Sequence, residues 1–131
     1  MSDIMRSLIA AICTAIGFLF GETDGMFIAL VVLITLDYIS GVIAAAVKKE
    51  LSSAVGAKGI AKKVFMLLIV VVANIVDVNV IGQGHALRTV VIIFYIANEC
   101  ISLLENAAEL GVPFPDKLMD ILKQLKDKNN K

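Results

Sequence analysis

Residues 25–47, GMFIALVVLITLDYISGVIAAAV, decide the fold of this chain. The run contains 23 residues and one charged side chain, Asp37, which lies at its centre. Because a helix of about 20 apolar residues crosses the roughly 30 Å hydrocarbon core of a bilayer, this run predicts a transmembrane helix.

Three further apolar segments flank this run in the sequence, one before it at residues 4–21 and two after it at residues 64–81 and 88–104. The segment nearest the N-terminus has only 15 uncharged residues between Arg6 and Glu22, so it spans only if Ile4 and Met5 join it and Arg6 snorkels to the interface. We therefore predict four transmembrane helices, with three as the alternative if this segment lies on the surface. Met5 is either an ordinary apolar residue or a second start after Met1.

Composition supports the same class of protein. Of the 131 residues, 59% are apolar and 18% are charged, and the mean hydropathy is +0.89. A soluble domain is about half apolar and about a quarter charged, and a soluble chain of this size has too little interior for so many apolar side chains. This excludes a disordered chain, a secreted disulfide scaffold and a nucleic-acid-binding domain. The prediction is an all-α integral membrane protein, with a transmembrane domain at residues 1–110 and a tail at 111–131.

The basic residues are unequally divided between the two ends of the predicted spans. With four spans, eleven basic residues fall on the side of both termini and the central loop, whereas only Arg88 falls on the other side. Since basic loops remain in the cytoplasm, both termini are predicted to be cytoplasmic. The central loop, residues 48–63, is expected to be flexible, and its lysines are Lys48, Lys49, Lys58, Lys62 and Lys63.

The tail is predicted to form a short amphipathic helix. Pro113 and Pro115 interrupt the preceding helix, and apolar residues then recur at i, i+3, i+4 and i+7. This spacing places one apolar face on the helix, made of Leu118, Ile121, Leu122 and Leu125. Such a helix lies on an anionic leaflet, packs on a sister helix, or is a solvated tail, and the sequence leaves these open.

Polar side chains lie inside three of the predicted spans. An ionisable residue at mid-bilayer costs about 2.5–3.5 kcal/mol on the insertion scale, so each such residue is a functional hypothesis. They form stripes at helical spacing, and we expect them to be assembly or pore-facing positions rather than contacts in a static bundle. The residues are Asp37, Ser40 and Gly41, then Asn74 and Asp77, then Asn98, Glu99 and Ser102.

No motif in the sequence indicates catalysis, a metal or a cofactor. Cys13 and Cys100 lie in apolar runs without the spacing of metal ligands, and the single histidine, His85, falls in a predicted outer turn without a nucleophile beside it. P-loop, GxSxG and HExxH patterns are absent. The chain is predicted not to be an enzyme.

Several stretches together resemble the phage lysis and toxin-secretion holin family. They are LDYISGVIAAA at 36–46, KKELSS at 48–53, GAKGIAKKV at 56–64, NECISLLEN at 98–106, and GVPFP at 111–115 followed by Lys117 and Leu118. The resemblance covers roughly residues 26–125. It implies a phage- or prophage-encoded protein of the bacterial cytoplasmic membrane that accumulates, forms homo-oligomers and opens lesions.

In such a system the lesions release a cytoplasmic endolysin, or a toxin, and an antiholin is a further implied partner besides membrane lipids. We expect Asp37 and Glu99 to be packed in protein in the silent state and to face water in the lesion. The alternatives are an antiholin, a passive membrane scaffold or a four-span transporter of the multidrug-exporter type. That transporter class usually carries a glutamate in its first span, and this chain has no charge between Arg6 and Glu22.

Overall fold

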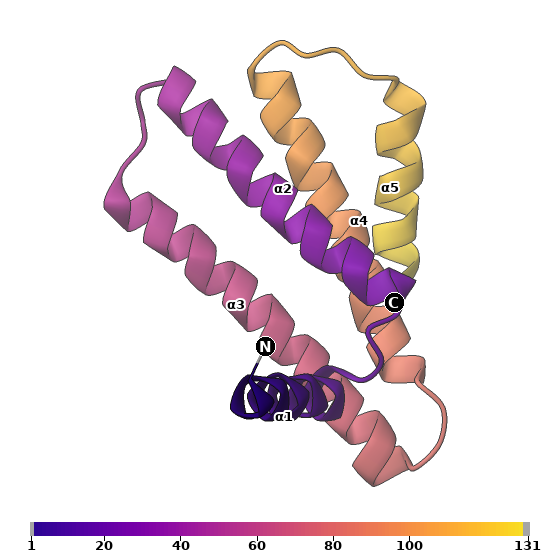
Figure 1. The fold of residues 1–131 in the computed structure, drawn as a ribbon. Coiled ribbons are helices and arrows are strands. Elements are labelled where there is room, and N and C mark those ends of the chain that lie inside the picture. The colour runs from indigo at the N-terminus through magenta and orange to yellow at the C-terminus, as the bar shows by residue number, and fades with distance from the viewer. Residues whose placement is uncertain (1, 130–131) are drawn as a thin grey trace.

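The computed structural model describes residues 2–129 and the side chains of residues 2–127, so Met1, the first of the two candidate starts, lies outside the described residues. The described chain is helical throughout apart from its connections (Figure 1). The helices are α1 (Asp3–Phe20), α2 (Gly25–Val47), α3 (Ser53–Val76), the π-helical segment η1 (Asp77–Ile81), α4 (Ala86–Glu109) and α5 (Asp116–Asn129).

Four helical segments are long and apolar enough to cross a membrane: α1, α2, the continuous run Ser53–Ile81 and α4. This confirms the predicted fold class, an all-α membrane protein with four candidate spans and a C-terminal helix. Among the described elements α4 is the central helix, because it packs against α2, α3 and α5 (Figure 1).

The bundle of α2, α3 and α4 has a small apolar core and a large apolar outside. Leu30, Ile34, Val70 and Ile92 are buried together at its centre. The outward faces of α2 and α3 carry exposed apolar side chains along most of their length, and these include Ile28, Val32, Leu36, Ile39 and Ile43 on α2 and Val64, Phe65, Leu68, Ile69 and Val72 on α3. This distribution suits a lipid environment, where an apolar surface has no cost.

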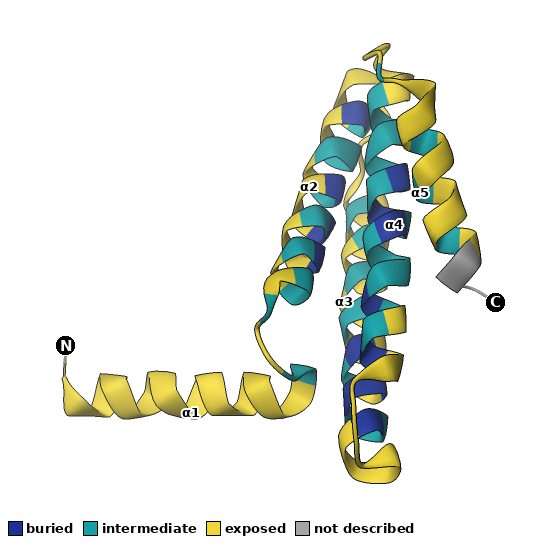
Figure 2. Cartoon of the chain, turned by 90° about the vertical axis from the view of Figure 1, so that its right-hand side faces the viewer, coloured by how far each residue is buried: buried dark blue, intermediate teal, exposed yellow. Residues whose placement is uncertain are grey.

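α1 is attached to the end of this bundle and does not pack along it. Figure 2 shows α1 running across the direction of the other helices, exposed over its whole length except at its last residue. That residue, Phe20, packs on Phe27 of α2 with 5.2 Å between ring centroids. α1 therefore meets the length and composition of a span, while only α2, α3 and α4 form the packed bundle.

The prediction of a flexible loop over residues 48–63 is wrong, because α3 begins at Ser53. The Ser52 side chain caps this helix by accepting a hydrogen bond from the Val55 backbone N–H at 3.1 Å. Gly56 and Gly59 of α3 provide space for the Tyr38 ring of α2. A Cβ on Gly56 would lie 3.3 Å from the Tyr38 hydroxyl. The connection is thus only residues 48–52, and Lys58, Lys62 and Lys63 belong to α3.

The tail does form the predicted helix, α5, which folds back along α4 (Figures 1 and 2). Met119, Leu122 and Lys126 are its half-buried residues, and the Lys126 ammonium lies 5.9 Å from the centre of the Phe94 ring of α4. Of the predicted apolar face only Leu122 is turned inward. Leu118, Ile121 and Leu125 remain 40–46% exposed on the flank of α5.

We predict that Leu30→Ala lowers the free energy of unfolding by about 2 kcal/mol, because it leaves a cavity in the core. This value is at the lower end for core truncations, because the protein is surrounded by lipid rather than water. Thermal unfolding in detergent micelles, followed by circular dichroism, measures this effect. Leu36→Ala is the control, since Leu36 is exposed and its truncation should change stability by less than about 0.5 kcal/mol. Equal losses for the two variants would contradict the assigned core.

Candidate functional site

Three charged side chains from three helices meet inside the bundle. The Lys63 ammonium of α3 lies 2.5 Å from Asp37 Oδ2 of α2, and 2.9 and 2.7 Å from the two carboxylate oxygens of Glu99 of α4. Glu99 is fully buried, the Asp37 side chain is 4% exposed and the Lys63 side chain is 20% exposed. We call Asp37, Lys63 and Glu99 the charged triad.

The triad brings together two residues that the sequence predicted as intramembrane sites and one that it assigned to a loop. Asp37 and Glu99 were predicted within spans, and the structure joins them through one cation. Lys63 was not predicted as their partner, because it immediately precedes the apolar run that begins at Val64 and was therefore placed outside the predicted span. The Ser52 cap was the available signal, since it starts the helix 11 residues before Lys63.

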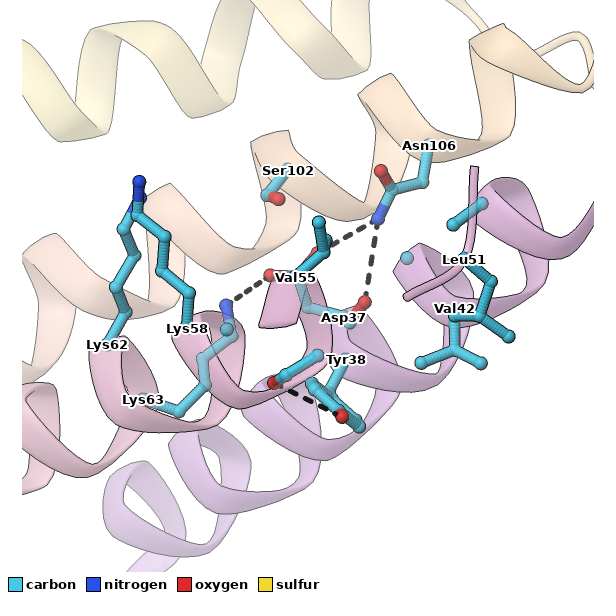
Figure 3. Close-up of a pocket in the computed structure, with 14 residues that line it drawn as sticks. Asp37, Tyr38, Val42, Leu51, Val55, Lys58, Lys62, Lys63, Ser102 and Asn106 are labelled. Atoms are coloured by element: carbon cyan, nitrogen blue, oxygen red, sulfur yellow. Dashed lines mark hydrogen bonds and ion pairs between the residues drawn. The ribbon is translucent and has the colours of Figure 1, made fainter. Parts of the chain in front are cut away.

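An amide and a hydroxyl extend the triad towards the end of the bundle where residues 48–52 connect α2 to α3. The Asn106 side-chain NH2 donates to Asp37 Oδ1 at 3.2 Å and to Ser40 Oγ at 2.8 Å, and the Ser40 hydroxyl donates to the Asp37 carbonyl at 2.9 Å. Figure 3 shows Asn106 and Lys63 reaching Asp37 from different helices. Gly41 lies against Asn106, since a Cβ there would be 3.6 Å from Asn106 Nδ2. Asn106 was absent from the predicted site.

The other predicted polar positions of α4 are less involved in the triad. Ser102 lines the same cavity as Asp37 and Lys63 (Figure 3). Asn98 is half-buried, and its side chain makes no hydrogen bond within residues 2–129. The stripe predicted from helical spacing therefore divides, and Glu99, Ser102 and Asn106 face the cavity or the triad.

A second polar cluster closes the opposite end of the bundle. Asp77 is fully buried and accepts hydrogen bonds from the backbone N–H groups of Leu87 and Arg88 at 3.2 and 2.8 Å, which caps the start of α4. Asn74 donates to the carbonyls of Phe18 and Leu19 at 3.2 and 3.1 Å and so holds the end of α1. Asn74 and Asp77, both predicted sites, thus act together here and are separate from the triad.

Arg88 is the cation of this second cluster. Its guanidinium donates to the Phe20 carbonyl at 2.6 Å, to the Glu22 carbonyl at 2.7 Å and to the Asp24 carboxylate at 2.9 Å, and only 3% of its side chain is exposed. Hydrogen bonding from Arg88 is the largest of the interactions that lower the pKa of the Asp24 carboxyl below its ordinary value. From the sequence, Arg88 entered only the count of basic residues on each side of the membrane, and its contacts with the end of α1 and with Asp24 were not predicted.

The remaining predicted lysines lie at the surface. Lys48 forms ion pairs with Glu109 at 3.3 Å and with Glu50 at 3.6 Å, and the hydrogen bond that its ammonium donates to the Glu109 carboxylate raises the pKa of Lys48. Lys49 is exposed, with a φ of 59° that allows the turn after α2. Lys58 and Lys62 are exposed on α3 and have no ion-pair partner among the described residues.

Nothing in the described part of the chain is arranged to hold a metal ion. Within residues 2–129 there is no cluster of three or more His, Cys, Asp or Glu side chains with that geometry. Cys13 and Cys100 are free thiols, and His85 precedes α4 as an exposed residue whose side chain makes no capping hydrogen bond.

Comparison with known proteins identifies the family. A model of the bacteriophage holin family matches residues 14–127, which include the whole bundle and nearly all of α5. The chain belongs to the bacteriophage holin family. Both polar clusters of this holin-family chain lie within the matched residues.

Three relatives illustrate the range of the match. The chain is 44% identical over 120 residues to an uncharacterised 14.9 kDa protein in the nagH 3′ region of Clostridium perfringens, covering 92% of this chain and 91% of the relative. It is 41% identical over 122 residues to an uncharacterised protein of Listeria innocua, covering 93% and 86%. It is 37% identical over 113 residues to a probable holin of Bacillus phage phi105, covering 86% and 82%. No solved structure matches the chain.

We predict that Lys63→Met lowers the free energy of unfolding by about 3 kcal/mol, because two carboxylates then remain buried without their cation. Chemical or thermal unfolding in micelles measures the loss. Lys62→Met is the matched control, since Lys62 is adjacent and exposed. Adding Asp37→Asn and Glu99→Gln to Lys63→Met should recover part of the stability. A similar loss for Lys62→Met and Lys63→Met would show that the triad does not stabilise the fold.

The lowered pKa of Asp24 predicts a loss of stability in acid. Because the folded state favours the charged carboxylate, its contribution is complete above the ordinary value of 3.8 and is lost as the pH falls through the lower folded-state pKa. The difference in unfolding temperature between the wild type and Asp24→Asn should therefore be constant above about pH 5 and shrink in stronger acid. Glu105→Gln, which alters an exposed carboxyl without an ion pair in the described chain, is the control for a general effect of removing one negative charge. A difference that does not vary with pH would contradict the role of the Arg88 contact.

Proposed function

We propose that this chain is a holin of the bacterial cytoplasmic membrane that accumulates, associates with copies of itself and opens lesions. The lesions would allow an endolysin, or a toxin in a related system, to leave the cytoplasm. Membership of the bacteriophage holin family and the similarity to a probable phage holin support this role, and they favour a non-enzymatic protein.

The observation that carries the proposal is a charged triad hidden inside a bundle whose outside is apolar. A single copy buries Asp37 and Glu99 and leaves only 20% of the Lys63 side chain exposed, which fits silent accumulation. Separation of α2, α3 and α4 would place these charges on helix faces that need water or another polar partner. The hidden charges therefore supply polar walls for a lesion once the helices rearrange.

The charge of the triad also makes the energy of the bundle depend on the membrane potential. With all three groups ionised it carries one net negative charge, and a charge moved through the whole membrane potential changes energy by about 2.3 kcal/mol per 100 mV. Collapse of the potential would therefore change the balance between a closed bundle and an open one. This dependence supports a sudden transition rather than gradual leakage.

The proposed orientation places residues 48–52 and the α4–α5 connection in the cytoplasm. The lysines near this end, among them Lys48, Lys49 and Lys58, support it through the preference of basic segments for the cytoplasmic side. The second cluster, with Arg88 neutralised by Asp24, then lies at the outer end. Both termini are cytoplasmic if α1 crosses the membrane.

The test is induction of the chain in a bacterium, with and without a co-expressed cytoplasmic endolysin, while growth and membrane potential are recorded. We expect abrupt depolarisation followed by lysis that requires the endolysin. Continued growth with an intact potential would contradict the proposal, and delayed killing of a second, active holin would identify an antiholin instead.

We further predict that Asp37→Asn and Glu99→Gln each bring forward the onset of lysis, because loss of one carboxylate weakens the contact that holds α3 to α2 or α4. Glu105→Gln is the control, since Glu105 is an exposed carboxylate of α4 outside the triad. Optical density and a potential-sensitive dye measure the onset, and immunoblotting checks equal accumulation. If both triad variants lyse at the wild-type time and to the wild-type extent, the triad has no role in triggering.

A further inference from the structure

A cavity of about 580 Å³ lies between α2, α3 and α4 beside the residue 48–52 connection. Asp37 and Lys63 of the charged triad line it, and so do Leu51 and Val55 near the connection (Figure 3). The cavity therefore extends from the end of the bundle to the triad. Nothing in the proposed lesion mechanism assigns a ligand to it.

The cavity wall has an excess of positive charge. Its lining includes three lysines, Lys58, Lys62 and Lys63, against one carboxylate, Asp37. Lys63 is already held by Asp37 and Glu99, whereas Lys58 and Lys62 have no ion-pair partner in residues 2–129. Two of the three cations are thus available to an anion.

Lys58 and Lys62 are placed to act on the same anion. They are four residues apart on α3, a spacing that brings side-chain origins to within about 5–6 Å on one helix face. Figure 3 shows the Lys58 and Lys62 side chains extending from α3 in the same direction. A phosphate group between the two ammonium groups would receive hydrogen bonds from both.

The apolar part of the lining indicates what kind of molecule carries this phosphate. Val42, Leu51 and Val55 line the cavity, and Leu51 and Val55 are 52% and 59% exposed. On α3, Ile60 is also exposed between the two lysines in the sequence. Inward of the lysines on the same face of α3, Phe65 and Ile69 are 64% and 44% exposed. A small water-soluble anion gains nothing from these surfaces, whereas the acyl chains of a phospholipid would cover Phe65 and Ile69.

We propose that this cavity binds one anionic phospholipid from the leaflet at the residue 48–52 end of the bundle. Its phosphodiester lies between the Lys58 and Lys62 ammonium groups, and its headgroup lies on the side of Leu51 and Val55. Its acyl chains run towards the centre of the bilayer over the exposed Phe65 and Ile69, three and seven residues beyond Lys62 on α3. A net negative headgroup complements the two free cations, and basic pockets between transmembrane helices recognise such lipids in general. Bound there, the lipid lies over the Asp37–Lys63 contact and limits the access of water to the triad.

The experiment titrates the full chain, purified in neutral detergent, with phosphatidylglycerol while thermal unfolding is measured, because a ligand of the folded state raises the unfolding temperature. Phosphatidylcholine and inorganic phosphate are titrated in parallel. Native mass spectrometry counts the lipids retained on each chain. The test variant is Lys58→Gln with Lys62→Gln. The matched control is Lys117→Gln with Lys123→Gln, which removes two exposed α5 lysines outside the cavity.

We expect phosphatidylglycerol to stabilise the wild type and the control, with one lipid retained per chain. The Lys58/Lys62 variant should bind it about 30-fold more weakly, since each lysine near an anionic lipid headgroup contributes about a fivefold change. Equal weakening of both double variants would overturn the proposal in favour of general surface charge. Equal stabilisation by phosphatidylcholine would remove the role of net charge, and stabilisation by inorganic phosphate alone would indicate a site for a free anion.

Discussion

The contact of Lys63 with Asp37 and Glu99 is the constraint on which the rest of the structure depends. Each of these charges alone, at mid-bilayer, costs about 2.5–3.5 kcal/mol on the insertion scale, so none is tolerable without the others. Because each comes from a different helix, α2, α3 and α4 must hold one register for the contact to form. The contact of the three charges fixes how α2, α3 and α4 are aligned along one another, and the apolar core around Leu30 and Ile92 packs in this alignment.

The hydropathy of the sequence was sufficient to predict the spans but not the partners within them. Residues 25–47 and 88–104 are apolar enough to be recognised whatever they contact. Lys63 was assigned to a loop because a prediction from hydropathy ends a span at a lysine. Hydropathy contains no information on the carboxylates that neutralise this ammonium, which are 26 and 36 positions away in the sequence. The same limit applies to the roles of Arg88 and Asn106, whose partners come from distant helices. The relation of α5 to α4 likewise depends on tertiary packing that leaves Leu118 and Ile121 exposed.

The two ends of the bundle differ in how far their charged groups are enclosed, although Asn74 Oδ1 at the Arg88 end is buried without a hydrogen-bond partner in the described chain. At one end Arg88 is 3% exposed and is surrounded by backbone carbonyls and Asp24, while Asp77 caps α4. At the other end a cavity reaches Asp37 and Lys63, and lysines without partners in the described chain stand beside it. Hydrogen bonds tie α1, α3 and α4 at the closed end, so separation of the helices costs less at the end that contains the cavity. At that end the triad and the Asn106 hydrogen bonds to Asp37 and Ser40 are polar contacts that resist such a separation.

α1 is the described helix that this arrangement leaves without a partner along its length. In lipid, apolar surface alone does not drive helices together, so association requires close packing of small residues or polar contacts. Gly17 in the last turn of α1 and Gly21, which follows its last residue, differ in this respect. A Cβ on Gly21 would lie 2.8 Å from Asn74 Oδ1 and 2.9 Å from Arg88 Nε. This glycine therefore allows the close packing of the Asn74 and Arg88 side chains at that end of the bundle. Gly17 faces open space, as do the exposed Ala11 and Ala15. The bundle already satisfies the charges of the triad. In the proposed self-association, the first contacts between copies would therefore form on surfaces of this kind, and the charges would become available only after those contacts.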